Sequence, residues 1–323
     1  MISRKALQVR NLKTYYFTER GIIEAVDNLT FEVEKGKVLG LVGESGCGKS
    51  TVALSIMRLV PVPGRIVAGE IIYDEKNILS MNYEELLAIR WKVISMVFQG
   101  SLSSLNPLFK IQDQISEAIR AHELVGAEES LERTRNLLKM VGLDPSRGTN
   151  YPHELSGGMK QRTLIAMALA CKPEFVIADE PTTALDVNVQ AQVLSLLKGL
   201  QEQMHLSMLY ISHDLPVIAE FCDAVAVMYA GRLVERAPST IFFQEPLHPY
   251  SRGLMRAFPR IEGKLEEIIS IPGAPPGLVA PPLGCRFHPR CGQAMEICRK
   301  EEPALIEVGR EHQVACHLIE RKR

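Results

Sequence analysis

The stretch Gly43 to Thr51, GESGCGKST, limits the fold of this chain more than any other part of its sequence. It follows the apolar run KVLGLV and precedes VALSIMRLV, which has the pattern of a helix. Glycines let backbone N–H groups curl around phosphates, and the positive end of a helix adds to the attraction. The order of strand, glycine loop and helix therefore predicts an α/β fold with a phosphate-binding loop.

The residue types inside this loop suit separate tasks. Lys49 can reach the terminal phosphates, and the Ser50 hydroxyl can hold Mg²⁺. Cys47 lies near the helix N-terminus, where the positive dipole favours a reactive thiolate, unless it only fills a tolerant position with a small side chain. The residues expected to contact nucleotide here are Gly43, Ser45, Gly46, Cys47, Gly48, Lys49, Ser50 and Thr51.

Two adjacent carboxylates end another apolar run, FVIADE, at Asp179 and Glu180. A buried parallel strand would bring them to the phosphate site, where Asp179 suits the organisation of Mg²⁺ and Glu180 suits the orientation of water. His213 follows a further apolar run, MLYIS. Taken alone, that histidine indicates only a structural role.

The composition excludes several classes of protein. Seven cysteines in 323 residues are too few for a disulfide scaffold, and the longest apolar stretch, LIAMALAC, is less than half a membrane span. The first ten residues hold no apolar segment of secretory length, so we expect a cytosolic chain. A formal net charge of -1 gives no general basic surface for nucleic acid, and we expect none as a partner.

The stretch LSGGMKQR, Leu155 to Arg162, completes a pattern that resembles the ATP-binding cassette ATPases. The elements follow in the family's order: phosphate loop at 43–51, glutamine loop at Gln99, signature at 155–162, acidic strand at 175–180, turn at 184–186 and His213. The resemblance covers about the first 255 residues. It implies a RecA-like core with an antiparallel β subdomain and a helical subdomain at about residues 100–165.

The resemblance also implies that two such subunits sandwich two ATP molecules. Ser156, Gly157 and Gly158 would open a helix whose N–H groups bind the γ-phosphate of the partner subunit's ATP. Asp186 would communicate across the dimer. The second subunit would be a distinct chain or another copy of this one.

The same resemblance assigns further roles in the nucleotide site. Gln99 would sense Mg²⁺ and the attacking water, and His213 would contact the γ-phosphate, so that the implied catalytic residues are Glu180, His213, Gln99 and Lys49. Tyr16 aligns with the aromatic residue that stacks on adenine. Because Tyr15 and Phe17 adjoin it, which of these aromatic residues matches the family's position stays open.

Four short stretches are similar to the peptide-importer branch of the family: SSLNP, SGGMKQR, TTALDV and HPYSRGL. This branch implies import of di- and oligopeptides by a peripheral subunit at the cytoplasmic face of the cell membrane. Its partners would be two permease subunits and, indirectly, an extracytoplasmic substrate-binding protein. After the glutamine the branch usually carries an acidic residue and then proline or a small residue, whereas this chain has Gly100 and Ser101. This departure points to a difference in coupling.

Other functions stay open at this point. The same machinery could import nickel complexes or oligosaccharides. A soluble cassette ATPase acting on ribosomes or DNA is a different class, but its members carry two cassettes or long coiled-coil insertions, which this chain lacks. A regulatory module with a vestigial ATPase would not need Lys49, Asp179, Glu180 and His213 together.

The composition changes beyond residue 258, where six of the nineteen prolines fall between Pro272 and Pro289. Such a stretch excludes a long helix or a central strand. We therefore expect a cassette domain at 1–258, followed at 259–323 by a proline-rich arm and a small irregular extension. This extension is similar to the C-terminal extension of dipeptide and oligopeptide importer ATPases.

Four cysteines in this extension predict a metal site: Cys285, Cys291, Cys298 and Cys316. Metal ligation would stabilise the folded form of a segment that has few apolar residues. The alternatives are that these cysteines are inert buried thiols or form disulfides. Zinc and iron–sulfur clusters both accept four thiolates. The resemblance to the peptide-importer branch favours a [4Fe-4S] cluster, serving as a structural staple or as a redox sensor.

Overall fold

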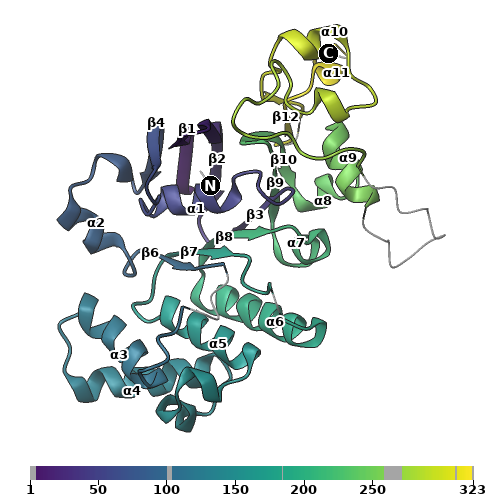
Figure 1. The fold of residues 1–323 in the computed structure, drawn as a ribbon. Coiled ribbons are helices and arrows are strands. Elements are labelled where there is room, and N and C mark those ends of the chain that lie inside the picture. The colour runs from purple at the N-terminus through teal and green to yellow at the C-terminus, as the bar shows by residue number, and fades with distance from the viewer. Residues whose placement is uncertain (1–4, 100–103, 184, 258–270, 310, 322–323) are drawn as a thin grey trace. The chain divides into compact units, whose positions relative to one another are not determined.

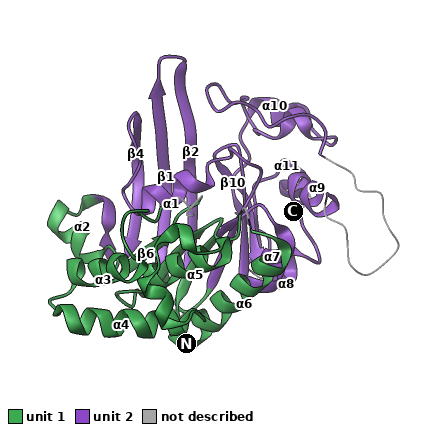
Figure 2. Cartoon of the chain, turned by 60° about the horizontal axis from the view of Figure 1, so that its bottom comes forward, with its two compact units in different colours: residues 1–6, 34–37, 80–210 green, residues 7–33, 38–79, 211–323 purple. Residues whose placement is uncertain are grey.

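The computed structural model describes residues 5–99, 104–183, 185–257, 271–309 and 311–321 (Figure 1). The chain divides into two compact units, which are coloured separately in Figure 2. Unit 1 comprises residues 1–6, 34–37 and 80–210, and unit 2 comprises residues 7–33, 38–79 and 211–323. These units do not coincide with the predicted domains at 1–258 and 259–323, which stay a prediction.

Unit 2 contains an antiparallel sheet with the strand order β2-β1-β4-β5. The strands are β1 (Lys5–Thr18), β2 (Gly21–Glu34), β4 (Gly64–Tyr73) and β5 (Lys76–Asn77); the first two residues of β1 and the last residue of β2 belong to unit 1. Along β2, Leu29, Phe31 and Val33 are buried while the residues between them are more exposed. This alternation buries one face of the sheet and leaves the other more open, as the resemblance implies for the β subdomain.

Further strands of unit 2 lie in the order β11-β12-β10-β9-β3. They are β3 (Val38–Val42), β9 (Ala224–Tyr229), β10 (Arg232–Pro238), β11 (Ile306–Glu307) and β12 (Gln313–Val314). β3 and β9 are parallel, and every residue of β3 is buried. A strand covered on both faces reads as a continuous apolar run, which explains KVLGLV.

The helices of unit 2 are short, which follows from the prolines and glycines between them. They are α1 (Lys49–Ile56), α7 (Leu215–Phe221), α8 (Ser239–Phe242), α9 (Pro249–Arg256), η5 (His288–Arg290), α10 (Glu296–Lys300) and α11 (His317–Glu320). In the described part of the proline-rich stretch, residues 271–290, the only helix is the three-residue turn η5 and no strand occurs, as predicted.

Unit 1 contains three neighbouring strands in the order β8-β7-β6. They are β6 (Ile94–Val97), β7 (Phe175–Asp179) and β8 (Ser207–Ser212), whose last two residues belong to unit 2. β6 and β7 are parallel, with Ile94 opposite Phe175. All residues of both strands are buried. Because the strands are parallel, the residues that follow their carboxyl ends lie at the same edge of the sheet.

The helices of unit 1 carry the periodic segments of the sequence. They are α2 (Tyr83–Ile89), α3 (Ile111–His122), α4 (Ala127–Met140), α5 (Gly157–Ala168) and α6 (Val187–Met204), with short 3-10 turns η1 (Ile78–Ser80, starting in unit 2), η3 (Pro145–Thr149) and η4 (Pro152–Glu154). α3 packs against α4, and the buried hydroxyls of Ser116 and Ser130 form a hydrogen bond of 2.7 Å between the two helices. Residues 100–103, at the start of the predicted helical subdomain, lie outside the described residues.

Within the residues that the structure describes, no helix is both long enough and apolar enough to cross a membrane.

Candidate functional site

Two glycines allow the loop between β3 and α1 to run close to its neighbours. Gly48 is the N-cap of α1 with a φ of 107°, and a Cβ there would fall on the carbonyl oxygen of Ala25. A Cβ on Gly43 would likewise meet the carbonyl oxygen of Met228. Glycine is the residue that tolerates this backbone and this approach, so the pattern read from the sequence has a steric cause.

Lys49 is the first residue of α1, and its side chain points back into the phosphate loop. Its side chain is buried, and Nζ donates to the carbonyl oxygens of Gly43 at 2.8 Å and Glu44 at 3.2 Å. An ammonium held by neutral carbonyls can exchange them for phosphate oxygens, which are stronger acceptors. All the predicted loop residues lie in this turn or at the start of α1: Gly43, Ser45, Gly46, Cys47, Gly48, Lys49, Ser50 and Thr51.

Cys47 differs from one of the two interpretations of the sequence. Its side chain is buried, and burial raises the pKa of the Cys47 thiol, although the nearby Lys49 ammonium partly opposes this. Burial therefore opposes the reactive thiolate that the helix dipole would favour, whereas the alternative of a small side chain at a tolerant position does not depend on the pKa. Desolvation affects the pKa of Cys47 more than the charge of the Lys49 ammonium does. The spacing of residues in the sequence does not show this desolvation.

We expect iodoacetamide to label Cys47 slowly at neutral pH and faster as the pH rises. Only the thiolate reacts, and a raised pKa keeps the thiol protonated. At pH 7 the labelling rate should be lower than that of the same cysteine in protein unfolded by guanidinium, because unfolding exposes the sulfur to solvent and removes the burial that raises its pKa. Mass spectrometry of the peptide containing Cys47 measures both rates; equal rates would contradict the burial of this thiol.

β7 ends in the two predicted carboxylates. Asp179 is buried, and Glu180 follows it with a φ of 46°, which is uncommon for a residue other than glycine. The Glu180 Oε2 accepts hydrogen bonds from Gln99 Nε2 at 3.1 Å and from Thr183 Oγ1 at 2.9 Å. The structure thus brings Gln99, which follows β6, to Glu180. Backbone strain of this kind clusters at functional sites.

The signature residues begin α5 in unit 1. Ser156 is the N-cap, and its hydroxyl accepts a backbone N–H of the first turn at 3.4 Å. Gly157 and Gly158 come next, and a Cβ on Gly158 would lie 2.5 Å from Val189 of α6. Asp186 caps α6 by accepting the N–H of Val189 at 3.0 Å. Two helix N-termini are therefore formed here, with backbone N–H groups suited to an anion.

The structure separates the three aromatic residues at the end of β1. The Tyr15 hydroxyl donates to Asp27 Oδ1 at 2.8 Å, so this side chain is engaged within unit 2. Tyr16 is half-buried and lies over Gly64, where a Cβ would come 2.7 Å from its ring. The Phe17 side chain is exposed.

The predicted nucleotide-site residues divide between the two units. Unit 1 holds Gln99, Asp179, Glu180, Ser156, Gly157, Gly158 and Asp186, and unit 2 holds the phosphate loop, Tyr16 and His213. His213 is exposed and follows β8 directly. Ala184, in the turn before Asp186, lies outside the described residues.

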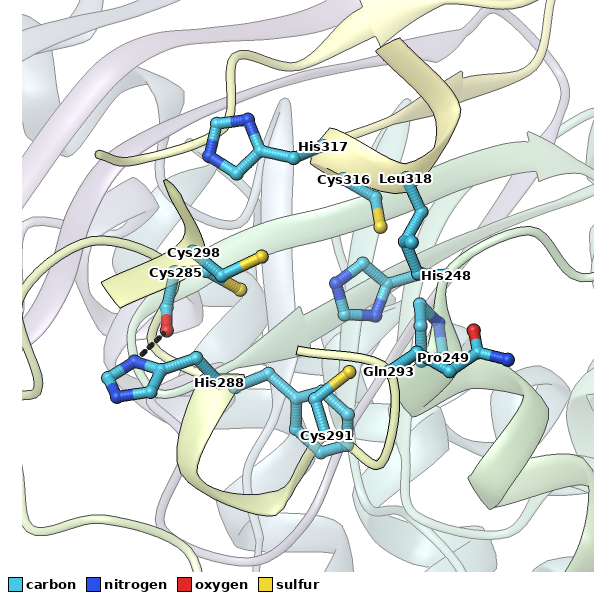
Figure 3. A pocket seen from close by; sticks show the side chains of 11 residues that line it. His248, Pro249, Cys285, His288, Cys291, Gln293, Cys298, Cys316, His317 and Leu318 are labelled. Atoms are coloured by element: carbon cyan, nitrogen blue, oxygen red, sulfur yellow. Dashed lines mark hydrogen bonds between the residues drawn. The ribbon is translucent and has the colours of Figure 1, made fainter. Parts of the chain in front are cut away.

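Four cysteines line one pocket of unit 2, together with His248 (Figure 3). The sulfur atoms of Cys285, Cys291, Cys298 and Cys316 face the same space, and all of them are free thiols. Within the described ranges, no group of three or more His, Cys, Asp and Glu side chains is arranged to hold a metal ion. The structure thus gathers the predicted cysteines without the geometry of a site for a single ion.

Backbone N–H groups approach all of these sulfur atoms. They belong to Phe287 for Cys285, Gln293 for Cys291, Met295 for Cys298, and Leu318 and Ile319 for Cys316. Burial raises the pKa of Cys285 to about 11 and also raises the pKa values of Cys291 and Cys316. The N–H groups act in the opposite direction, because they stabilise a thiolate.

Sequence reasoning missed several residues that contact the predicted site. The Tyr250 hydroxyl accepts the backbone N–H of Glu44 at 2.9 Å, and Arg290 forms an ion pair with the Glu44 carboxylate. Thr183, which bonds to Glu180, was also not singled out. Tyr250 and Arg290 occur in the motifs HPYSRGL and GCRFHPRC, but no local pattern links those motifs to a loop some 200 residues earlier.

Comparison with known families gives two matches along the chain. A family described as ABC transporter matches residues 26–183, and one described as oligopeptide/dipeptide transporter, C-terminal region, matches residues 234–298. The chain is 45% identical to the oligopeptide transport ATP-binding protein AppD of Bacillus subtilis, over 97% of each chain. It is 43% identical to the dipeptide transport ATP-binding protein DppD of Caldanaerobacter subterraneus, over 98% of each.

Solved structures give the same fold. The ATP-binding cassette MJ0796, in a dimeric post-hydrolysis state bound to ADP and Pi, is 28% identical and matches with a TM-score of 0.65. The match covers 72% of this chain and 98% of that one. CbiO1 of Clostridium perfringens, part of the ABC transporter complex cbiONQ, is 26% identical, also with a TM-score of 0.65, over 75% and 92% of the two chains.

Proposed function

Because this chain belongs to the ATP-binding subunits of dipeptide and oligopeptide ABC transporters, we propose that it hydrolyses ATP to power the import of di- and oligopeptides across the cell membrane. The observation that carries this proposal is the presence on one chain of both a cassette and the C-terminal region described for these transporters. The contacts around Lys49 and Glu180 support its chemistry.

Lys49 is the residue proposed to receive the terminal phosphates of ATP. Its ammonium is already inside the loop, and exchange of two carbonyl oxygens for charged phosphate oxygens strengthens its hydrogen bonds. Ser50, Gln99 and Asp179 are proposed to hold Mg²⁺, because a hydroxyl, an amide oxygen and a carboxylate are oxygen ligands that this ion accepts. When bound, Mg²⁺ neutralises charge that develops on the phosphates.

Glu180 is proposed to orient the attacking water and to accept its proton. One carboxylate oxygen accepts hydrogen bonds from Gln99 and Thr183, which fixes the direction of the group. The positive φ at Glu180 turns the chain sharply at the end of β7, as expected where a side chain must stand at a strand edge. Gln99 then both holds the carboxylate and offers its amide oxygen to Mg²⁺ or water.

Two residues of unit 2 complete the proposed nucleotide site. Tyr16 is assigned to the adenine ring, because Tyr15 is engaged with Asp27 while the Tyr16 ring is half-buried against a glycine. His213 is assigned to the γ-phosphate, because it is exposed directly after a buried strand.

Dimerisation is proposed to bring a second ATPase subunit to the start of α5. There Ser156, Gly157 and Gly158 would present N–H groups to the partner subunit's ATP, and Asp186 would respond to its binding. The partner is a distinct chain or a second copy. ATP binding would then close the dimer and hydrolysis would reopen it.

A permease subunit is the proposed occupant of a groove in unit 1. The groove is lined in part by Trp91, Phe109, Gln114 and His122, and the exposed fraction of Phe109 is 54%. The exposed Phe109 and the partly exposed Trp91, beside polar residues, suit a helix from a membrane subunit. Gly100 and Ser101, where the sequence departs from the branch, lie outside the described residues.

The four-cysteine pocket is proposed to hold a [4Fe-4S] cluster. The donor set fits, because its thiols face one space and each sulfur has a backbone N–H partner, the kind of hydrogen bond that tunes iron–sulfur sites. Zinc is the alternative. Four thiolates around zinc stand about 3.8 Å apart, given a Zn–S distance of about 2.3 Å. A [4Fe-4S] cluster is wider than a single ion, and analysis of the iron, sulfide and zinc content of the purified protein distinguishes the two.

The cluster's role is proposed to be structural. The described residues from 271 onward form only short helices and two-residue strands, and ligation would tie these elements together. Redox sensing of transport is the second role that such a site could have. The chain itself is proposed to work as a peripheral subunit at the cytoplasmic face of the membrane, bound to two permease subunits that receive peptide from an extracytoplasmic binding protein.

A strain that lacks this chain but keeps its transporter partners should lose uptake of radiolabelled di- and oligopeptides to background. Wild-type protein should restore uptake, and Glu180→Gln protein should not, because uptake requires hydrolysis. Uptake of a free amino acid serves as the control and should not change. Loss of nickel or oligosaccharide uptake with intact peptide uptake would replace the proposed cargo, and intact uptake of all three would favour a non-transport ATPase.

A further inference from the structure

Arg290 connects the four-cysteine element to the phosphate loop within unit 2. Its guanidinium forms a two-pronged ion pair with the Glu44 carboxylate, with Nη1–Oε2 at 2.7 Å and Nη2–Oε1 at 3.0 Å. Glu44 is the second residue of the loop motif. The exposed fraction of the Arg290 side chain is only 6%, so this pair is screened far less than a surface salt bridge.

The arginine side chain is itself held in place. Nε donates to the carbonyl oxygen of Pro272 at 2.9 Å, and the guanidinium lies 5.8 Å from the centre of the Tyr229 ring. Tyr229 packs edge-on against both Tyr250 and Phe287. A planar guanidinium fixed on several sides fixes the carboxylate that it binds.

The buried residue Tyr250 holds the same loop residue at its backbone. Its hydroxyl accepts the Glu44 N–H at 2.9 Å, while Arg290 holds the side chain. The backbone and the side chain of Glu44 are therefore both held by residues that lie far away in the sequence. Because the Glu44 carbonyl oxygen also accepts from Lys49, its position affects the lysine that is proposed to bind phosphate.

The backbone of Arg290 belongs to the turn between two of the cysteines. Its N–H donates to the Phe287 carbonyl at 3.0 Å, and the next residue, Cys291, donates to the His288 carbonyl at 3.3 Å. The His288 N–H donates in turn to the Cys285 carbonyl at 2.9 Å. A change in how Cys285 or Cys291 is held would therefore move the turn that carries Arg290.

The charges involved predict that the Arg290–Glu44 ion pair favours ATP binding. ATP brings several negative charges to the loop, and an unpaired Glu44 carboxylate beside them would repel them. Arg290 neutralises that carboxylate and holds it aside. We propose that Arg290 is a positioning residue of the phosphate loop, through which the four-cysteine element strengthens ATP binding. This inference rests on the proposed function, because it assumes that the loop binds ATP.

The test is equilibrium titration with a fluorescent ATP analogue under non-hydrolysing conditions. Arg290→Gln should raise Kd about tenfold, which corresponds to about 1.4 kcal/mol, within the range for hydrogen bonds to charged groups. In steady-state assays KM should rise with kcat little changed, because Arg290 does not contact the reacting atoms. Arg299→Gln is the matched control: Arg299 adjoins Cys298 but is exposed, and its Kd should equal that of wild type.

A second substitution distinguishes the loss of charge neutralisation at Glu44 from an unspecific disturbance of the structure. Glu44→Gln removes the repelling carboxylate, so the double variant Glu44→Gln/Arg290→Gln should bind within about twofold of Glu44→Gln alone. A defect that persists in the double variant, or an unchanged Kd in Arg290→Gln, would overturn the role of Arg290. Wild-type protein that binds no nucleotide would instead overturn the proposed function.

The contribution of the cysteine element is measured in the same titration. Cys291→Ser should raise Kd when Arg290 is present and add little in the Arg290→Gln background, because both changes act through one contact. Circular dichroism melting shows whether each variant is folded, and Cys316→Ser replaces Cys291→Ser if the latter is not. Additive effects of the two substitutions, or an unchanged Kd in the folded cysteine variant, would contradict transmission through Arg290.

Discussion

Replacing Glu180 with glutamine is expected to lower ATP hydrolysis by about 10²- to 10⁴-fold, the usual contribution of a positioned acid or base. Glutamine keeps the shape of the side chain but cannot accept a proton from water. ATP binding should persist, because Lys49 and the phosphate loop are unchanged, and the closed dimer should accumulate. Phosphate release measures hydrolysis, and size-exclusion chromatography with ATP and Mg²⁺ measures the dimer.

The matched control is Glu202→Gln, which removes the same charge from an exposed position of α6 in the same unit. Its hydrolysis rate should equal that of wild type. Unimpaired hydrolysis in Glu180→Gln would remove Glu180 from the catalytic role, whatever the strain in its backbone.

Replacing Cys291 with serine is expected to abolish the metal content of the chain. Anaerobically purified wild-type protein should contain about four irons and four acid-labile sulfides and absorb visible light, since a [4Fe-4S] cluster uses four thiolates. One missing thiolate leaves the cluster unsupported, so iron, sulfide and visible absorption should fall together. Elemental analysis and the absorption spectrum report this independently of ATPase activity.

Cys222→Ala provides the control for the metal measurement. Cys222 is buried in unit 2 but does not line the four-cysteine pocket, so its loss should leave iron and sulfide unchanged. One zinc per wild-type chain would replace the cluster with the alternative metal. No metal at all would make the four thiols a purely structural group and contradict the proposed cluster.

Helix ends show where local sequence patterns stop predicting. The run VALSIMRLV is helical only to Ile56, because Arg58 adopts a φ of 50° and the prolines of PVP follow. The segment ending KMVGL is helical to Met140, and Gly142, with a φ of 71°, follows the end as a left-handed glycine commonly does. Periodicity identified both helices, while backbone conformation set their last residues.

The candidate site divides in the same way. The phosphate loop and the helix that starts at Gly157 were predictable, because their steric demands lie within a few consecutive residues. The hydrogen bond from Gln99 to Glu180 needed two parallel strands to end at one edge, which the order of elements only implied. The raised pKa of Cys47 could not be predicted from the sequence, because burial depends on what the fold packs around the thiol.

By itself, the sequence determined the phosphate loop, the signature helix, the two strands that end before the phosphate loop and at Asp179, and the cysteines that could share a site. These features depend on residue types and spacings over short stretches, where sterics and periodicity act. Only the tertiary structure decided that Arg290 holds Glu44 and that the cysteine sulfurs face one space. The two residues of that ion pair are 246 positions apart, and a contact over such a separation exists only once the whole fold has brought its partners together.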